Sequence, residues 1–155
     1  MKRLELLIPP LLFAGVLMAL IAFLSWWLPA GSMELPQPWR YGLASLLALF
    51  SFALVLPAAW AFAKANTTVN PRRPDATQAL VSHGWYRFTR NPMYLGFLLA
   101  LISTTLFTGH VSGVFISMMF VPYMNRFQIA PEERFLAQQF GDVYLNYCQH
   151  VRRWL

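Results

Sequence analysis

The chain has 155 residues, a length that suits one domain and excludes two independent domains of ordinary size. Its residues are 57% hydrophobic and only 12% charged, whereas soluble domains carry about 25% charged residues. A soluble protein of this size cannot bury so much apolar surface, so the composition favours a membrane protein. The single cysteine, Cys148, excludes an intramolecular disulfide and a cysteine-based metal site, and we expect no metal.

Two uninterrupted charge-free stretches predict membrane-spanning helices. They cover residues 6–28 and 41–63, and each exceeds the roughly 20 residues that a helix needs to cross a ~30 Å hydrocarbon core. Lys2 and Arg3 precede the first stretch as in a secretory signal. That stretch is longer than a signal core, however, and no small-residue cleavage site follows it. We therefore expect the first helix to be retained.

A third charge-free stretch, residues 93–125, would measure about 50 Å as one helix, too long for a single crossing. Gly109 and Gly113 near its middle predict a turn. We therefore expect a helical hairpin over residues 92–107 and 111–127, either crossing the membrane or tilted and partly embedded. The predicted fold class is an all-α transmembrane bundle of about four helices, forming one domain, with a cytoplasmic amphipathic C-terminal helix.

The placement of the basic residues predicts the orientation. Of the 12 Lys and Arg residues, only Arg40 lies in the loop between the first two expected helices, where Glu34 offsets it. With four crossings, all the other basic residues share one side, and the positive-inside rule makes that side cytoplasmic. The net charge of +6 thus lies beside membrane segments, and we expect a lipid bilayer, and no nucleic acid, as partner.

Two polar segments are the candidates for chemistry, and residues 64–91 form the first. This segment ends in a dense mixture of aromatic residues, hydrogen-bond donors and glycine directly before an apolar helix. Pro92 suits the first turn of that helix and Asn91 suits its N-cap. One interpretation is a membrane-surface loop, with Arg87 and Arg90 on lipid phosphates and the aromatic side chains in the interfacial belt.

The second candidate is the C-terminal segment. Leu136, Phe140 and Tyr144 recur at helical spacing, as in an amphipathic helix that lies on the membrane or on the bundle. Glu132 and Glu133 supply two of the six carboxylates, directly after a membrane helix. They either stabilise the first turn of a helix or bind hydroxyls or an ammonium group of a polar cofactor, and their spacing leaves both interpretations open.

Two series of residues, in this order, resemble a known family. The first is Gly84-x-Tyr86 followed by Arg90-Asn91-Pro92-Met93-Tyr94, and the second is Glu132-Glu133 followed by Phe140-Gly141-x-x-Tyr144-x-x-Tyr147. Together they are similar to the integral membrane methyltransferases, which include isoprenylcysteine carboxyl methyltransferases and phospholipid (phosphatidylethanolamine) methyltransferases. The similarity covers residues 78–153, about half of the chain, and the two series flank a helical hairpin as in that family.

The resemblance implies methyl transfer from S-adenosylmethionine to a membrane lipid or a lipophilic small molecule. The cofactor would lie between the loop before the hairpin and the acidic segment after it. Glu132 would hold a polar group of the cofactor, and Glu133 is a candidate second partner. Many relatives carry histidine in place of Asn91, and both side chains can donate a hydrogen bond. The other residues that would line the cofactor by family pattern are Gln78, Ala79, Leu80, Val81, Tyr86, Asn91, Pro92, Met93 and Tyr94.

One position departs from the isoprenylcysteine branch, in which we expect a basic residue about one helical turn before the binding glutamate. Gln128 occupies that position, and the nearest cation, Arg126, lies about 200° around a helix from it and would point elsewhere. Gln128, for its position, and Arg126, as the nearest cation, are the candidate substrate-binding residues. A neutral or cationic acceptor, such as an amine headgroup, fits better than a prenylcysteine carboxylate.

Two other functions are compatible with the pattern. One is a non-enzymatic membrane scaffold or assembly protein that has lost the cofactor. The other is a related membrane reductase, which four spans disfavour because such enzymes usually have more helices. Methyl transfer itself requires positioning and desolvation, with no acid–base pair or metal, and we assign no catalytic residue.

Overall fold

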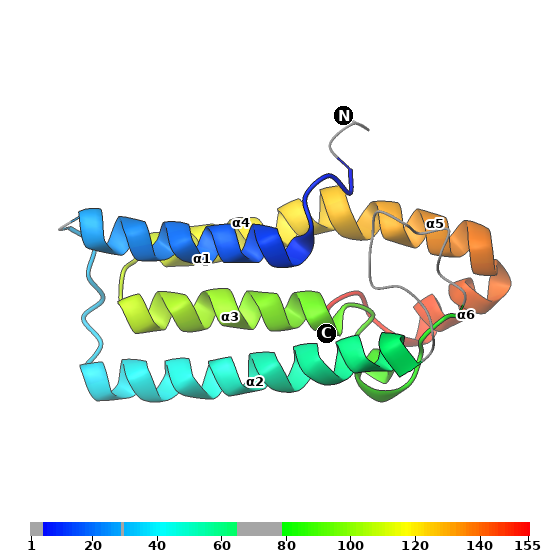
Figure 1. Cartoon of the computed structure of the whole chain (residues 1–155), viewed down its shortest axis with the longest axis horizontal. Helices are drawn as coiled ribbons and strands as arrows, with labels where there is room; N and C mark the ends of the chain where they lie inside the picture. Colours follow the sequence, from blue (N-terminus) through cyan, green and yellow to red (C-terminus); the bar gives the residue numbers. More distant parts are fainter. Residues whose placement is uncertain (1–4, 29, 65–78) are drawn as a thin grey trace.

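The computed structural model describes residues 5–28, 30–64 and 79–155, and every regular element in these residues is helical. This confirms the all-α prediction for the described part of the chain. Four helices lie side by side along the long axis of the molecule (Figure 1). They are α1 (Pro10–Trp27), α2 (Gln37–Lys64), α3 (Pro92–Thr108) and α4 (Ser112–Tyr123).

The remaining helices lie at one end of this bundle (Figure 1). A short 3₁₀ helix, η3, precedes α3, and α4 continues without a break through a π-helical segment, η4, into α5. The helix α6 follows after a bend at Gly141. Their bounds are Gly84–Arg87 for η3, Met124–Ile129 for η4, Ala130–Phe140 for α5 and Asp142–His150 for α6.

Helices α1 and α2 are long and apolar enough to cross a membrane, with 18 and 28 residues and mean hydropathies of 2.0 and 2.2 in their most apolar windows. Only 17% of this stretch of α1 and 22% of this stretch of α2 is buried inside the protein. Most of the apolar surface of both helices therefore faces outward, as it does on a lipid-facing helix. The apolar helix α3 has 17 residues and α4 has 12, both short for a full crossing. Four crossings therefore stay a prediction.

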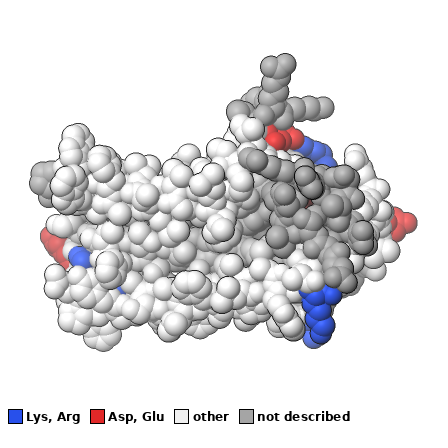
Figure 2. Space-filling view, in the orientation of Figure 1, with Lys and Arg blue, Asp and Glu red and all other residues white. Residues whose placement is uncertain are grey.

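Charged side chains gather at the two ends of the bundle, and the middle of the face drawn in Figure 2 shows none. The core between α1, α3 and α4 is correspondingly apolar, with Ile21, Leu101 and Phe120 fully buried. Phe13 of α1 stacks on Tyr123 of α4, with ring centroids 4.0 Å apart. We therefore look for a polar site at the end of the bundle that carries α5 and α6.

The predicted hairpin of α3 and α4 is confirmed, with Gly109 in the left-handed conformation (φ +65°) that ends α3. The backbone N–H of Ser112 donates to His110 Nδ1 (3.2 Å), so Nε2 carries the ring hydrogen and donates to the Ala30 carbonyl (2.8 Å). The N–H of Val111 also donates to the Gly31 carbonyl (2.8 Å). The loop after α1 is thereby tied to the hairpin turn.

Helices α2 and α3 approach closely. A Cβ added at Gly96 would lie 2.4 Å from Val55 Cγ2 and 3.1 Å from the Ser51 carbonyl oxygen, so only glycine fits there. The Ser51 hydroxyl donates to the Gly96 carbonyl and the Ser103 hydroxyl to the Ala44 carbonyl, both at 2.8 Å. Small residues and interhelical hydrogen bonds of this kind are typical of helix pairs in membranes.

Two predicted helix boundaries were wrong. Helix α1 begins at Pro10 instead of residue 6, because Pro9 lacks an N–H and Pro10 suits a first helical turn. Helix α2 begins at Gln37 instead of residue 41, and Pro38 again suits the first turn. The early start of α2 places Arg40 beside the end of α3, where its guanidinium donates to the Phe107 carbonyl (3.5 Å).

The last predicted segments also differ from the structure. The fourth helix does not end near residue 127 but runs on to Phe140, because the wider π turn of η4 absorbs Pro131. The amphipathic C-terminal helix is two helices, separated at Gly141, whose φ of +52° favours glycine.

Pro57 in α2 and Pro131 in the continuous α4, η4 and α5 rod each leave a backbone carbonyl without its helical partner, and distant segments supply the missing donors; Pro122 also lies inside α4. Pro57 has no N–H for the Ala53 carbonyl, which instead accepts a hydrogen bond from Trp85 Nε1 (2.9 Å). Pro131 has none for the Phe127 carbonyl, which instead accepts from the Leu6 N–H (3.0 Å). The first bond fastens η3 to α2, and the second fastens the N-terminal segment to η4.

We expect Trp85→Phe to lower the free energy of unfolding by about 0.5–1.5 kcal/mol, because it removes the donor of the Ala53 carbonyl. In a Pro57→Ala background the same change should cost much less, since the new N–H of residue 57 can bond that carbonyl. The lost packing of the indole ring is common to both backgrounds and cancels. A double-mutant cycle by denaturant titration in micelles measures the difference, and additive effects would contradict this account.

Candidate functional site

The Glu132 carboxylate is the centre of the candidate site. Because η4 and α5 are continuous, Gln128 and Glu132 lie one helical turn apart on the face that meets the beginning of α3. Tyr94 of α3 donates its hydroxyl hydrogen to Glu132 Oε1 (2.7 Å), and Gln128 Nε2 donates to the same oxygen (2.5 Å). Tyr94 and Gln128 are both buried, so this cluster of three side chains joins α3 to the rod formed by α4, η4 and α5.

Burial raises the pKa of Glu132 from its ordinary value of 4.5 to about 7. The hydrogen bonds from Tyr94 and Gln128 act in the opposite direction, and the neighbouring Glu133 charge adds to the increase. Part of the residue's surface remains exposed, but the carboxyl group itself is surrounded by protein atoms. A carboxylate held in this way gains from a cationic or hydroxyl-bearing ligand, which supplies the partner that water no longer provides.

Tyr86 forms a second wall of the site. The ring is buried in η3 against Val81, Ala58 and Ala61, and Tyr147 of α6 donates its hydroxyl hydrogen to the Tyr86 carbonyl (2.6 Å). Burial, with the nearby Tyr147 and Glu132, raises the pKa of Tyr86 above its ordinary value.

Glu133 points to other partners. Its carboxylate forms ion pairs with Arg90 (3.1 Å) and with Arg153 (2.5 Å), and it raises the pKa of Arg153. The N–H of Arg90 also donates to the Arg152 carbonyl (2.9 Å). Trp154 Nε1 also donates a hydrogen bond to Asn125 Oδ1 (2.9 Å). The ion pairs and this hydrogen bond together attach the C-terminal residues to the start of α3 and to η4.

Asn91 occupies the N-cap position of α3, as predicted, but its side chain does not cap the helix. Its Nδ2 donates to the Arg153 carbonyl (2.9 Å) instead. The roles that the sequence analysis missed are those of Arg90 and Arg153 around Glu133. Two basic residues 63 positions apart give no local signal of a shared partner.

The structure brings together most of the predicted cofactor residues. Tyr94 and Glu132 are in contact, and Met93 packs against both the cluster that holds Tyr94 and the cluster that holds Tyr86. Pro92 and Val81 are buried, while Ala79 and Leu80 are half-buried ahead of η3. Gln78 lies outside the described residues.

The two candidate substrate-binding residues lie in different places. Gln128 lies in the Glu132 cluster, but Arg126 lies on an exposed face, where it forms an ion pair with Glu5 (2.9 Å). Glu5 also pairs with Arg134. The rod turns Arg126 away from the Glu132 cluster, the direction expected from its helical phase, and its role in substrate binding stays a prediction.

The comparison with protein families decides what kind of protein carries this cluster. The phospholipid methyltransferase family matches residues 39–143, a range that includes Tyr86, Tyr94, Gln128 and Glu132. The chain belongs to the phospholipid methyltransferase family. The resemblance drawn from the two residue series is thus confirmed.

Three relatives illustrate the range of this methyltransferase family. An uncharacterised protein of Haemophilus influenzae is 46% identical over 63 residues, which are 41% of this chain and 100% of that protein. Protein-S-isoprenylcysteine O-methyltransferase A of Arabidopsis thaliana is 38% identical over 73 residues, 46% of this chain and 36% of the relative. Methanethiol S-methyltransferase 1 of Bradyrhizobium diazoefficiens is 37% identical over 67 residues, 43% of this chain and 22% of the relative.

The chain thus spans only about a third, or less, of the length of the two relatives whose names state an activity. No solved structure matches the chain. Within residues 5–28, 30–64 and 79–155, no group of three or more His, Cys, Asp or Glu side chains is arranged to hold a metal ion.

We expect Glu133→Gln to lower the free energy of unfolding by at least about 1 kcal/mol, because Arg90 and Arg153 lose the charge that both of them contact. Arg134→Gln is the matched control, since it removes one arm of a more exposed ion pair and should change stability by less than about 0.5 kcal/mol. Denaturant titration of the micellar protein measures both. Equal effects of the two variants would contradict the structural role of Glu133.

Proposed function

We propose that this family member transfers a methyl group from S-adenosylmethionine to a lipophilic acceptor that resides in the membrane. The observation that carries the proposal is the desolvated Glu132 carboxylate, held by Tyr94 and Gln128 in a chain of the phospholipid methyltransferase family. S-adenosylmethionine carries an ammonium group, ribose hydroxyls and a sulfonium. These are the groups that a carboxylate with a raised pKa binds favourably, so the residues fit the cofactor.

The chain's own residues supply binding and exclusion of water. When bound, S-adenosylmethionine supplies a methyl group on a positively charged sulfur, and its transfer is an in-line displacement. Tyr94 and Gln128 both donate to Oε1 and so fix the direction of the Glu132 carboxylate toward a ligand. The buried Tyr86 and Val81 keep water away from the same region. Positioning and desolvation of this kind account for most of the catalysis that such a displacement needs.

We place the cofactor side of the site at the cytoplasmic surface. The cluster lies at the end of the bundle where η3, α5, α6 and the C-terminal residues meet. Apart from Arg40, the described basic residues belong to that end, which supports four crossings with this end inside. The polar cofactor would then arrive from the cytoplasm and the lipophilic acceptor from the bilayer.

The surroundings of Glu132 favour a neutral or amine-bearing acceptor over a carboxylate. Gln128 carries no charge, and Arg126 is engaged by Glu5 on another face. Of the described cations near the site, Arg90 and Arg153 both pair with Glu133. These two cations share the single negative charge of Glu133, so the preference for a neutral or amine-bearing acceptor rests on Gln128 and Arg126.

An isoprenylcysteine-type carboxyl methyltransferase is the second candidate, and the similarity to the Arabidopsis thaliana enzyme favours it. A non-enzymatic scaffold is less well supported, because the Tyr94, Gln128 and Glu132 cluster is complete. A buried carboxylate without a ligand lowers stability, and a scaffold would gain nothing by keeping it.

We expect Glu132→Gln to weaken S-adenosylmethionine binding about 10- to 100-fold, the loss of one charge-assisted hydrogen bond of ~1.5–3 kcal/mol. Glu133→Gln should have a smaller effect.

The carboxylate is the binding form of Glu132, so the affinity for S-adenosylmethionine should rise with pH through about 7 and fall by up to about tenfold per pH unit below it. Calorimetric titration between pH 5.5 and 8.5 measures this change in affinity. The Glu132→Gln protein should lose the part of the pH dependence that centres on about pH 7 and keep only the part that comes from the ligand's own groups. Unchanged affinity in a folded Glu132→Gln protein would refute the site.

The acceptor is tested by offering methyl-labelled S-adenosylmethionine with a panel of amine lipids, a farnesylcysteine analogue and a small thiol in parallel. We expect label on an amine lipid or on another neutral lipophilic molecule of the protein's own membrane extract. Rapid methylation of the farnesylcysteine analogue, with no lipid labelled, would establish the second candidate instead. Absence of labelled product in every reaction, together with absence of cofactor binding, would favour the scaffold.

A further inference from the structure

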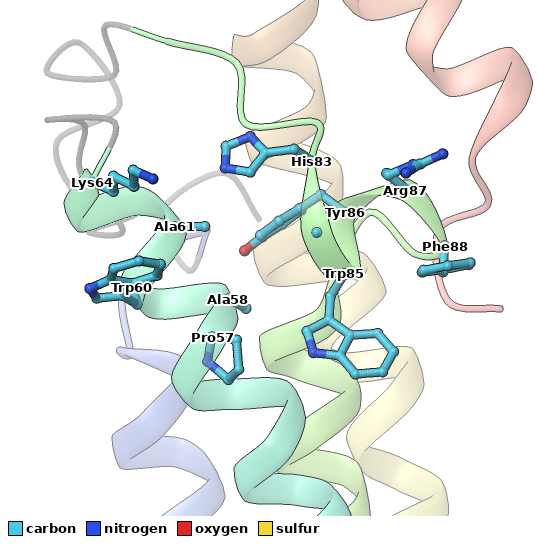
Figure 3. A pocket seen from close by; sticks show the side chains of 11 residues that line it. Pro57, Ala58, Trp60, Ala61, Lys64, His83, Trp85, Tyr86, Arg87 and Phe88 are labelled. Carbon is cyan, nitrogen blue, oxygen red and sulfur yellow. The ribbon is translucent and has the colours of Figure 1, made fainter.

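A pocket of about 450 Å³ lies between the last turns of α2 and the η3 segment (Figure 3). Its floor is made by Ala58, Ala61 and the buried Tyr86. Ala58 and Ala61 are three residues apart, so their small side chains lie on one face of α2 and leave room beside η3. The Trp85 indole, which donates to the Ala53 carbonyl, holds the opposite wall in place.

The mouth of the pocket carries cationic and hydrogen-bonding groups. Lys64 and His83 lie on the same side of the pocket in Figure 3, and Arg87 extends from the other side of η3. No Asp or Glu is among the described residues that line the pocket. Neither Lys64 nor Arg87 forms an ion pair within the described part of the chain. The mouth therefore presents positive charge that the described residues do not neutralise, which suits an anion.

The outer walls are aromatic and exposed. Trp60 and Phe88 are each 66% exposed, and Trp85 is 38% exposed. Aromatic residues in this position, at the end of an outward-facing apolar helix, belong to the interface between headgroups and acyl chains. Leu56, one helical turn before Trp60 on the same face of α2, is 63% exposed, so the outward face of α2 beside the pocket is apolar. An occupant must therefore combine an anionic group with an apolar chain.

This pocket is separate from the Glu132 cluster. Of that site only Tyr86 lines it, and the buried Tyr86 ring stands between the two. We propose that the protein binds one anionic phospholipid of the bilayer here, with the headgroup phosphate on Lys64 and His83 and an acyl chain along Trp85 and Phe88. The bound lipid joins α2 to η3 and so supports the segment that carries Tyr86 into the site.

The test is native mass spectrometry of the whole protein released from micelles that contain phosphatidylglycerol or phosphatidylcholine, without S-adenosylmethionine. The wild-type protein should retain one phosphatidylglycerol in preference to phosphatidylcholine. Lys64→Gln should reduce that retention about fivefold, the effect expected for one basic residue at an anionic surface. Arg152→Gln is the matched control, because it removes an equal charge at the same end of the molecule but outside the pocket, and it should retain the lipid normally.

Equal losses in Lys64→Gln and Arg152→Gln would overturn the proposal, because they would indicate general attraction to anionic lipids. Displacement of the lipid by millimolar inorganic phosphate would overturn it too, since it would identify a site for free phosphate. The experiment measures lipid retention alone, so its failure would leave the proposed methyl transfer untouched, and failure of methyl transfer would leave this result untouched.

Discussion

A backbone carbonyl that faces apolar surroundings must find a hydrogen-bond donor, and this requirement fixes the docking of two segments in the structure. Pro57 and Pro131 each remove the donor that a helix would normally provide. Trp85 and Leu6 replace it from distant parts of the chain. The positions of η3 and of the N-terminal segment thus depend on proline positions in α2 and α5. Because η3 carries Tyr86, the candidate site inherits its geometry from Pro57, a residue that no ligand needs to touch.

Burial of the Glu132 carboxylate lowers the stability of the protein unless a ligand pairs with it. The folded protein holds the Glu132 proton more tightly than the unfolded chain does, since its pKa is about 7 against an ordinary 4.5. Between these two values the folded state binds more protons, so this residue's contribution to stability falls as pH rises. At neutral pH and above, the cost is present in full, and a cationic or hydroxyl-bearing ligand offsets it. Glu133, one residue away, is instead neutralised by Arg90 and Arg153 and stabilises the fold.

Helices and the hairpin were predictable from the sequence because they follow from local properties: long charge-free runs, Gly109 at a turn and Pro92 at a helix start. Residue types in a familiar order predicted the family and named Tyr94, Gln128 and Glu132, which the structure brings together, while their role in binding stays a prediction. The π turn was not predictable, because the Phe127 carbonyl inside it accepts from the distant Leu6 N–H, a contact that no local pattern indicates. The partners of Glu133 were not predictable either, since the return of Arg153 to the start of α3 is a tertiary contact.

The close fit of α2 against α3 has a consequence for the lipophilic acceptor proposed above, which would reach the site from the bilayer. At Gly96 the Val55 side chain and the Ser51 carbonyl leave no space for even one added methyl group, and Ser51 and Ser103 join the same two helices by hydrogen bonds. An acyl or prenyl chain cannot slide between helices joined in this way. Lateral diffusion of a lipid toward Glu132 is therefore barred along this side of the molecule, and any gate for it has to open elsewhere on the perimeter.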